Sequence, residues 1–153
     1  MKPNHDPWLE NAHANAELLD QEIKNLRRKI SAGADFILSQ PIFQPETVEA
    51  FFQRYKELHG SNDGPFRLGI PLLAGILPLY SLRHATFLNN EVPGIAISTS
   101  LIERLQDAGG SAPQEGVRIA LELVDQIRPW ANGIYLMPQF SRYDLAAEIV
   151  EGS

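Results

Sequence analysis

The spacing of apolar residues predicts a chain rich in amphipathic helices. The first apolar stripe, over residues 17–31, consists of Leu19, Ile23, Leu26 and Ile30, and Gly33 follows as a natural helix stop. Similar stripes predict further helices over 45–58, 82–88, 101–105, 111–127 and 141–149. Pro45 suits a first helical position, Ser81 can cap a helix, and Ser111 and Gln114 have the spacing of a capping box. Residues 1–15 show no periodicity and are expected to form a loop.

Short apolar runs alternate with these helices and predict strands over 35–39, 68–77, 94–97 and 133–137. Because a helix follows each run, the strands are expected to pair in parallel, with the helices outside. A (β/α)8 barrel needs about 250 residues, so about four βα units amount to half of one. An open flavodoxin-like sheet would require five strands, the first of them near the N-terminus, whereas this chain begins with a loop and a helix. The predicted fold is α/β, the C-terminal half of a (β/α)8 TIM barrel, with residues 1–15 as a loop and residues 16–153 as the half-barrel.

Charge and composition exclude several classes of protein. The formal net charge is −6, and the one basic cluster, over residues 24–29, has acidic neighbours, so no nucleic-acid partner is expected. The absence of cysteine rules out disulfides, thiolate metal sites and a cysteine nucleophile. The longest apolar run, over residues 68–80, contains prolines and glycines and is too short to span a bilayer. We therefore expect a soluble, cytoplasmic protein with no membrane partner.

In a (β/α)8 barrel the functional site gathers at the carboxyl ends of the strands. The sequence places amide, hydroxyl and aromatic side chains there, including Gln40, Tyr80 and Gln139, and few acids. These groups suit hydrogen bonding to a flat heterocycle better than general acid–base chemistry. The structural alternatives are that Gln40 satisfies loop backbone groups and that Tyr80 only closes the barrel mouth. The four histidines have no metal-binding spacing and are expected to be solvated or to cap helices.

Residues 25–43 contain a basic helix end, then Ala-Gly-Ala-Asp, then a strand that ends in Ser39-Gln40. Together with two later segments, in order along the chain, this segment resembles the methylenetetrahydrofolate reductase family. Residues 70–79 are similar to a strand motif of this family. Residues 90–95 resemble the form found in bacterial proteins that join this reductase to a homocysteine methyltransferase. The resemblance runs from about residue 17 to the C-terminus, where Tyr135 resembles the end of the last strand.

This resemblance implies an FAD-dependent enzyme that reduces 5,10-methylenetetrahydrofolate to 5-methyltetrahydrofolate with NAD(P)H. It implies folate-binding positions at Gln40, whose amide would bond the pterin ring, and at Tyr80, Leu82 and Gln139. It places the FAD diphosphate and ribose against one helix, at Glu22, Asn25, Arg28 and Lys29. Glu22, Asn25 and Lys29 do share a helical stripe. Arg28 and Lys29, near the C-terminal end of the helix, also complement the helix dipole, which is the structural alternative.

The sequence also departs from the family pattern. Leu82 stands where several members have a stacking Phe, and Gln139 where some have an Arg, which Arg142 could replace. The acids that the family uses beside folate and flavin would belong to the N-terminal half of the barrel, so no catalytic residue is assigned here. We expect a chain that is inactive alone and that forms an oligomer or lacks its N-terminal half-barrel. The alternatives are a non-catalytic flavin- or pterin-binding protein, a half-barrel completed by a partner, and a different (β/α)8 enzyme.

Overall fold

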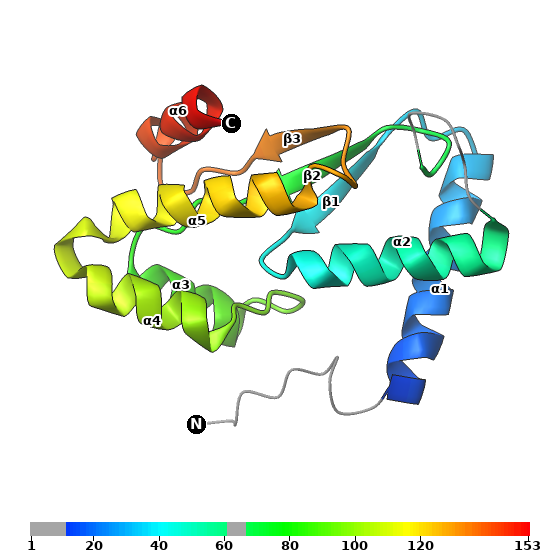
Figure 1. Ribbon diagram of the computed structural model, residues 1–153, viewed down its shortest axis with the longest axis horizontal. Helices are drawn as coiled ribbons and strands as arrows, with labels where there is room; N and C mark the ends of the chain where they lie inside the picture. Colours follow the sequence, from blue (N-terminus) through cyan, green and yellow to red (C-terminus); the bar gives the residue numbers. More distant parts are fainter. Residues whose placement is uncertain (1–11, 61–66) are drawn as a thin grey trace.

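The computed structural model describes residues 12–60 and 67–153, with side chains from residue 16 onward (Figure 1). Its elements are α1 (Ala12–Ser31), β1 (Ile37–Pro41), α2 (Pro45–His59), β2 (Leu72–Ile76), α3 (Leu82–Glu91), α4 (Thr99–Ala108), the 3-10 helix η1 (Gly109–Ser111), α5 (Ala112–Ile127), β3 (Gly133–Leu136) and α6 (Tyr143–Gly152). The predicted loop over residues 1–15 is wrong for residues 12–15, which belong to α1; the rest of that loop lies outside the described residues.

The strands form a parallel sheet in the order β1-β2-β3, as the alternation of strands and helices predicted. Leu38 pairs with Leu73 across β1 and β2, and Gly75 pairs with Tyr135 across β2 and β3. The β1–β2 register shifts between Leu38 and Pro41, where the Ser39 hydroxyl accepts a hydrogen bond from the Gly75 N–H at 2.9 Å. A side chain therefore replaces a backbone partner near the carboxyl end of β1. The α/β arrangement is consistent with a TIM-barrel-like fold.

The predicted strand over residues 94–97 is wrong. Because β2 pairs directly with β3, the sheet leaves no position for a strand between them. The Ile97 N–H instead donates to the Asn89 side-chain oxygen at 2.8 Å. The Ile97 side chain is buried with Leu88 and Leu105, so this apolar run packs against helices rather than pairing. The four predicted βα units therefore correspond to three strands in the described part of the chain.

Helix α5 provides most of the core on one face of the sheet. Its buried side chains share a cluster with two strand residues, Ala74 and Ile76, and with two residues of α6, Leu145 and Ile149. Helix α2 covers the neighbouring part of the sheet, where Phe52 packs on Leu72 and on the apolar stripe of α1. Figure 1 shows α3 and α4 on the side toward which the strand arrows point, with α1 at the opposite side.

Local sequence signals set some helix starts and fail at others. The Ser81 hydroxyl accepts from the His84 N–H at 3.1 Å, which confirms the predicted cap of α3. The capping box predicted at Ser111 is wrong, because η1 leads straight into α5 and Ser111 makes no cap. Helix α6 begins at Tyr143 rather than near Ser141, whose φ of 60° lies in the left-handed region. In the described part of the chain, no helix is both long and apolar enough to span a membrane.

Candidate functional site

The connections after β2 and β3 meet at the carboxyl edge of the sheet and bring together two of the predicted substrate-binding residues. Tyr80 follows β2 and Gln139 follows β3, and the buried ring of His84 in α3 joins them. The His84 Nε2 lies 2.8 Å from the Gln139 Oε1. The Tyr80 ring stacks on the imidazole with centroids 4.1 Å apart and planes inclined by 22°. The three side chains form one contiguous cluster.

His84 was expected to be solvated or to cap a helix, but its side chain is only 4% exposed. Burial lowers the pKa of the imidazole because the charged form loses hydration, and the Gln139 bond only partly opposes this effect. Within the described part of the chain, its Nδ1 is buried without a hydrogen-bond partner. The sequence held one signal of this arrangement: Tyr80 and His84 are four residues apart across a helix start that Ser81 caps, and their rings stack.

The connection from β3 to α6 presents an exposed aromatic ring beside this cluster. Phe140 is 78% exposed, its φ is 52°, and its ring meets the Tyr80 ring edge-on with centroids 6.1 Å apart. A bulky side chain rarely adopts a left-handed backbone, and such strain is concentrated at functional sites. The Arg142 guanidinium lies 5.9 Å from the centre of the Tyr80 ring. It binds both oxygens of Asp144, and this bonding holds the pKa of the Asp144 carboxyl below its usual range.

Gln40 lies at the carboxyl end of β1, and its side chain is exposed. Its neighbour is the irregular segment after α3, because a Cβ added to Gly94 would lie 3.2 Å from the Gln40 Oε1. The strand end beneath it is held by the Tyr135 hydroxyl, which donates to the Ser39 carbonyl. The structure therefore confirms the predicted position of Gln40 at the carboxyl end of a strand, while its role in binding stays a prediction. Its amide is open to a ligand and is not used in loop hydrogen bonds within the described residues.

Leu82 is half-buried in the first turn of α3. It lines a shallow depression on the outer face of this helix together with Arg83, Thr86, Phe87, Asn90 and Glu91. Leu82 is absent from the stacked rings around Tyr80, although it is only two residues away in sequence. The structure thus joins Tyr80 and Gln139 and places Leu82 on the adjoining surface.

The four predicted cofactor-binding residues all lie on α1. Glu22, Arg28 and Lys29 are exposed, and Asn25 is half-buried, with its side-chain oxygen accepting from Gln21 at 3.0 Å. The predicted amphipathic stripe is confirmed, because Leu26 and Ile30 pack against α2 while the polar residues face outward. No hydrogen bond or ion pair joins these four residues to Gln40, Tyr80 or Gln139 in the part of the chain that the structure describes.

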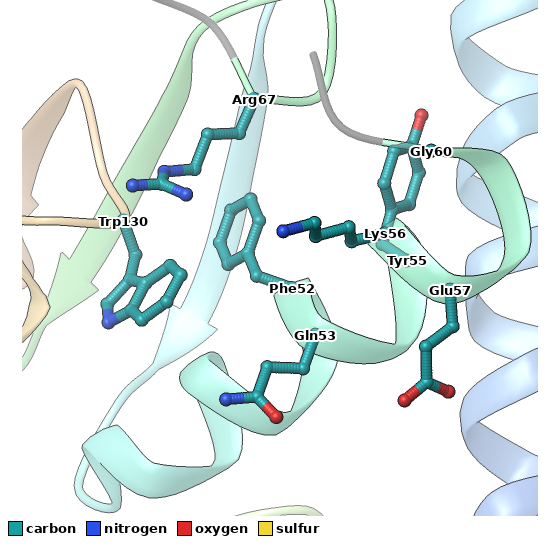
Figure 2. A pocket seen from close by; sticks show the side chains of 8 residues that line it. All are labelled: Phe52, Gln53, Tyr55, Lys56, Glu57, Gly60, Arg67 and Trp130. Carbon is teal, nitrogen blue, oxygen red and sulfur yellow. The ribbon is translucent and has the colours of Figure 1, made fainter. Parts of the chain in front are cut away.

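A cavity of about 380 Å³ lies between α2, Arg67 and Trp130 (Figure 2). Arg67 and Trp130 precede β2 and β3, so this cavity is near the amino ends of the strands, whereas Tyr80 and Gln139 follow the carboxyl ends. Phe52 of α2 stacks on Trp130 with centroids 5.5 Å apart, and the Arg67 guanidinium lies 4.7 Å from the centre of the Trp130 ring. In (β/α)8 barrels the amino-end face serves stability, and ligands bind at the other face. We therefore assign this aromatic packing a structural role: it holds α2 against the residues that lead into β3. No cluster of acidic or histidine side chains suited to a metal occurs among residues 12–60 and 67–153.

Comparison with known proteins agrees with the fold. The nearly complete chain, residues 6–150, matches the methylenetetrahydrofolate reductase family. Among solved structures it is similar to an uncharacterised protein from Clostridium thermocellum described as binding two copies of 5-methyl-5,6,7,8-tetrahydrofolic acid, with a TM-score of 0.64 and 16% sequence identity. That alignment covers 87% of this chain and 47% of the other protein, so the chain spans about half the length of this relative in fold. By the family match, the chain belongs to the methylenetetrahydrofolate reductase family.

Proposed function

We propose that this chain is the C-terminal half of the catalytic barrel of a methylenetetrahydrofolate reductase and contributes part of the folate and flavin sites. The observation that carries the proposal is the family match over residues 6–150, which coincides with amide and aromatic side chains at the carboxyl ends of parallel strands. The folate ligand of the Clostridium thermocellum protein supports a folate as the substrate class.

The proposed folate site consists of Gln40, Tyr80, Leu82 and Gln139. An amide side chain has both a donor and an acceptor, so Gln40 can pair with the edge of a pterin, which offers both. The Tyr80 ring is rigidly stacked on His84, and the exposed Phe140 ring beside it adds apolar surface suited to an aromatic group. These contacts would orient the substrate; they would not supply a proton.

FAD is the proposed cofactor, with NAD(P)H as the source of hydride. The residues of α1 fit such a group. Arg28 and Lys29 are exposed, and no ion pair engages either of them in the described part of the chain, so both can bind a diphosphate. Glu22, on the same helix, can accept hydrogen bonds from ribose hydroxyls. Bound FAD would supply the hydride-transfer chemistry, while this chain would hold and orient it.

The chain alone is proposed to be inactive. Asp144 lies beside the Tyr80–Gln139 cluster, and Arg142 neutralises it through a bidentate pair. A carboxyl whose pKa lies below its usual range cannot serve as a proton donor near neutral pH. The acid that protonates folate would therefore come from the N-terminal half of the barrel.

Substitution of Gln40 tests this proposal. The chain is titrated with 5-methyltetrahydrofolate in a calorimeter, and Gln40→Ala is expected to weaken binding about tenfold, because one amide can make more than one hydrogen bond. The control is Gln126→Ala, an exposed amide of α5, which should leave the affinity unchanged. Reductase activity should appear when an N-terminal half-barrel of the family is supplied, and it should fall in Gln40→Ala. Equal affinities and rates for wild type and Gln40→Ala would contradict the site.

A second candidate function is a non-catalytic, flavin- or pterin-binding half-barrel that a partner chain completes. The observation that favours it is the exposed apolar surface at one side of the sheet. Within the described residues β1 pairs with β2 alone, and Phe36 and Leu38 are 54% and 52% exposed. An edge strand with one unpaired side and exposed apolar side chains is a template for association. Persistent folate or flavin binding without any activity after addition of an N-terminal half-barrel would support this second function.

A further inference from the structure

The Gln139 side-chain amide has two possible orientations, with either its oxygen or its nitrogen toward His84. The contact with His84 decides between them. If the His84 Nε2 carries the proton, it donates to the Gln139 Oε1, and the Gln139 amide nitrogen faces away. If the amide is reversed, its nitrogen donates to Nε2, and the proton of the neutral imidazole must lie on Nδ1. The two arrangements present opposite chemistry to a ligand at the carboxyl ends of β2 and β3.

Burial of Nδ1 favours the first arrangement. Nδ1 has no hydrogen-bond partner among the residues that the structure describes, and the whole side chain is 4% exposed. A buried N–H without an acceptor is rarer and more costly than a buried lone pair without a donor. The proton therefore lies on Nε2, in agreement with the 2.8 Å contact from Nε2 to the Gln139 Oε1. The Tyr80 ring, stacked at 4.1 Å, prevents the imidazole from turning to another partner.

This arrangement leaves the amide nitrogen of Gln139 available. Its Oε1 is engaged by His84, its backbone carbonyl accepts from the Arg142 N–H at 3.1 Å, and within the described residues the amide nitrogen makes no hydrogen bond. Gln139 is half-buried beside the exposed ring of Phe140, so a ligand that covers this ring comes close to the amide.

We propose that His84 is a positioning residue that fixes the Gln139 amide with its nitrogen toward the ligand, so that this position selects a hydrogen-bond acceptor oxygen. The inference rests on the proposed folate site and extends it: the group selected would be a carbonyl or carboxylate oxygen of the folate. His84 itself touches no ligand. It acts through Gln139, and its neutral ring serves as a fixed donor beneath the site.

The tautomer of His84 tests the positioning statement without any ligand. In the nitrogen-15-labelled chain at pH 7.5, long-range proton–nitrogen spectra should show a neutral ring with a protonated Nε2 and a bare Nδ1. Nitrogen-15 relaxation of the Gln139 side-chain amide should show restricted motion, as expected for a fixed side chain. A His84 ring protonated on Nδ1, or on both nitrogens, would overturn the proposal.

Binding of 5-methyltetrahydrofolate tests the selection of an acceptor. Gln139→Glu keeps an oxygen for the His84 Nε2–H but removes the donor, so it should weaken binding about tenfold or more. His84→Leu should weaken binding to a similar extent, and His84→Gln, which restores a donor, should remain within about threefold of wild type. In a Gln139→Ala background His84→Leu should have no further effect, because the two residues act as one unit. Unfolding by urea, followed for every variant, verifies that each is folded.

The outcomes separate this inference from the proposed function. Independent, additive losses for His84→Leu and Gln139→Ala, or full affinity in Gln139→Glu, would overturn the positioning role while folate binding stands. Wild-type chain that fails to bind 5-methyltetrahydrofolate at millimolar concentration would overturn the folate site, and the tautomer then decides the positioning role by itself. A parallel titration with 6-methyltetrahydropterin identifies the acceptor: an equal loss in Gln139→Glu places it on the pterin, and no loss places it on the benzoylglutamate part.

Discussion

A buried neutral imidazole organises the carboxyl edge of the sheet at the scale of single residues. His84 lies beneath Tyr80, donates to Gln139 and carries no charge that the interior would have to accommodate. The Arg142 guanidinium lies 5.9 Å from the centre of the Tyr80 ring, and Asp144 neutralises it. The edge of the site is therefore built from neutral donors and ring surfaces, which suits a flat heterocycle whose own polar groups determine the hydrogen bonding.

Stability should fall below neutral pH because His84 titrates differently in the two states. Its pKa is lowered in the folded chain by burial, whereas the unfolded chain has the ordinary value of about 6.5. Between the two pKa values the unfolded chain binds more protons than the folded chain. The contribution of His84 to the free energy of unfolding is therefore complete above about pH 6.5 and is lost as pH decreases, at up to about 1.4 kcal/mol per pH unit. Urea unfolding at pH 5.0, 6.0 and 7.5 measures this dependence.

The matched variant for this measurement is His84→Gln, which keeps a polar side chain of similar reach but has no titrating group. Its free energy of unfolding should change less between pH 7.5 and pH 5.0 than that of the wild type. His59 is exposed at the C-terminal end of α2 and serves as the control: His59→Gln should leave the pH dependence as it is in the wild type. Parallel pH curves for wild type and His84→Gln would show that another group causes the loss.

The proposed flavin contact is also argued at the residue scale. Arg28→Ala is expected to weaken FAD binding about tenfold, because a guanidinium that bonds a phosphate contributes more than a neutral donor. Quenching of flavin fluorescence on titration measures the affinity. Arg128→Ala is the matched control, since Arg128 is an exposed arginine at the end of α5 whose partner is Asp125. A similar change in both variants would indicate a general charge effect rather than a site on α1.

At the scale of elements, the backbone of α5 lies close to the residues after β2 at Gly116. A Cβ added to Gly116 would lie 1.6 Å from the Leu79 carbonyl oxygen and 2.6 Å from the carbonyl carbon. Backbone cannot move aside as a flexible side chain can. A glycine at this position therefore allows α5 to lie against the residues that lead from β2 into Tyr80. It thereby helps to fix the position of Tyr80 relative to α5.

Gly116→Ala should destabilise the fold by about 3 kcal/mol or more, because the clash is with backbone and exceeds ordinary overpacking. Urea unfolding measures the loss. Gly110→Ala is the control: the same substitution meets nothing within 4 Å there, and the expected change is about 0.5 kcal/mol or less. If Gly116→Ala were as stable as Gly110→Ala, α5 would have to lie farther from Leu79 than the structure places it.

At the scale of the whole molecule, a three-stranded parallel sheet is covered well on the side of α5 and α6 and less well elsewhere. Ala74 and Ile76 are buried against α5, whereas Leu38 on the adjoining strand is half exposed. Parallel sheets normally have helices on both faces or close into a barrel. The similarity to about half of a larger protein is consistent with this uneven coverage.

Isolated chain should therefore self-associate through the side of the sheet that carries Leu38. Leu38→Lys should lower the weight-average mass measured by light scattering at a given concentration, because a charged side chain opposes pairing at an exposed strand. Leu58→Lys, at a 42% exposed leucine of α2, is the control and should leave the mass unchanged. A wild-type chain that stays monomeric at high concentration would contradict the half-barrel proposal.

Much of the fold was accessible from local sequence. The apolar stripe of α1, the Pro45 start of α2 and the Ser81 cap of α3 are properties of neighbouring residues, and the structure confirms each of them. The carboxyl-edge positions of Gln40, Tyr80 and Gln139 also followed from the order of strands and helices. Whether these residues bind folate remains a prediction, as do the assigned roles of Leu82 and of the α1 residues.

Other features depended on partners that are distant in sequence. The apolar run over 94–97 has the composition of a strand, but a strand exists only where a neighbour offers hydrogen bonds, and β3 occupies that place beside β2. Local sequence gives no sign that His84 has a specific hydrogen-bond partner, because Gln139, which contacts it, is 55 residues away in the sequence. The sequence by itself determined the helices, the α/β class and the family, because these follow from periodicity and motifs along the chain. Only the tertiary structure decided strand pairing, burial and the direction of the Gln139 amide, because each depends on free-energy differences among groups that folding alone brings together.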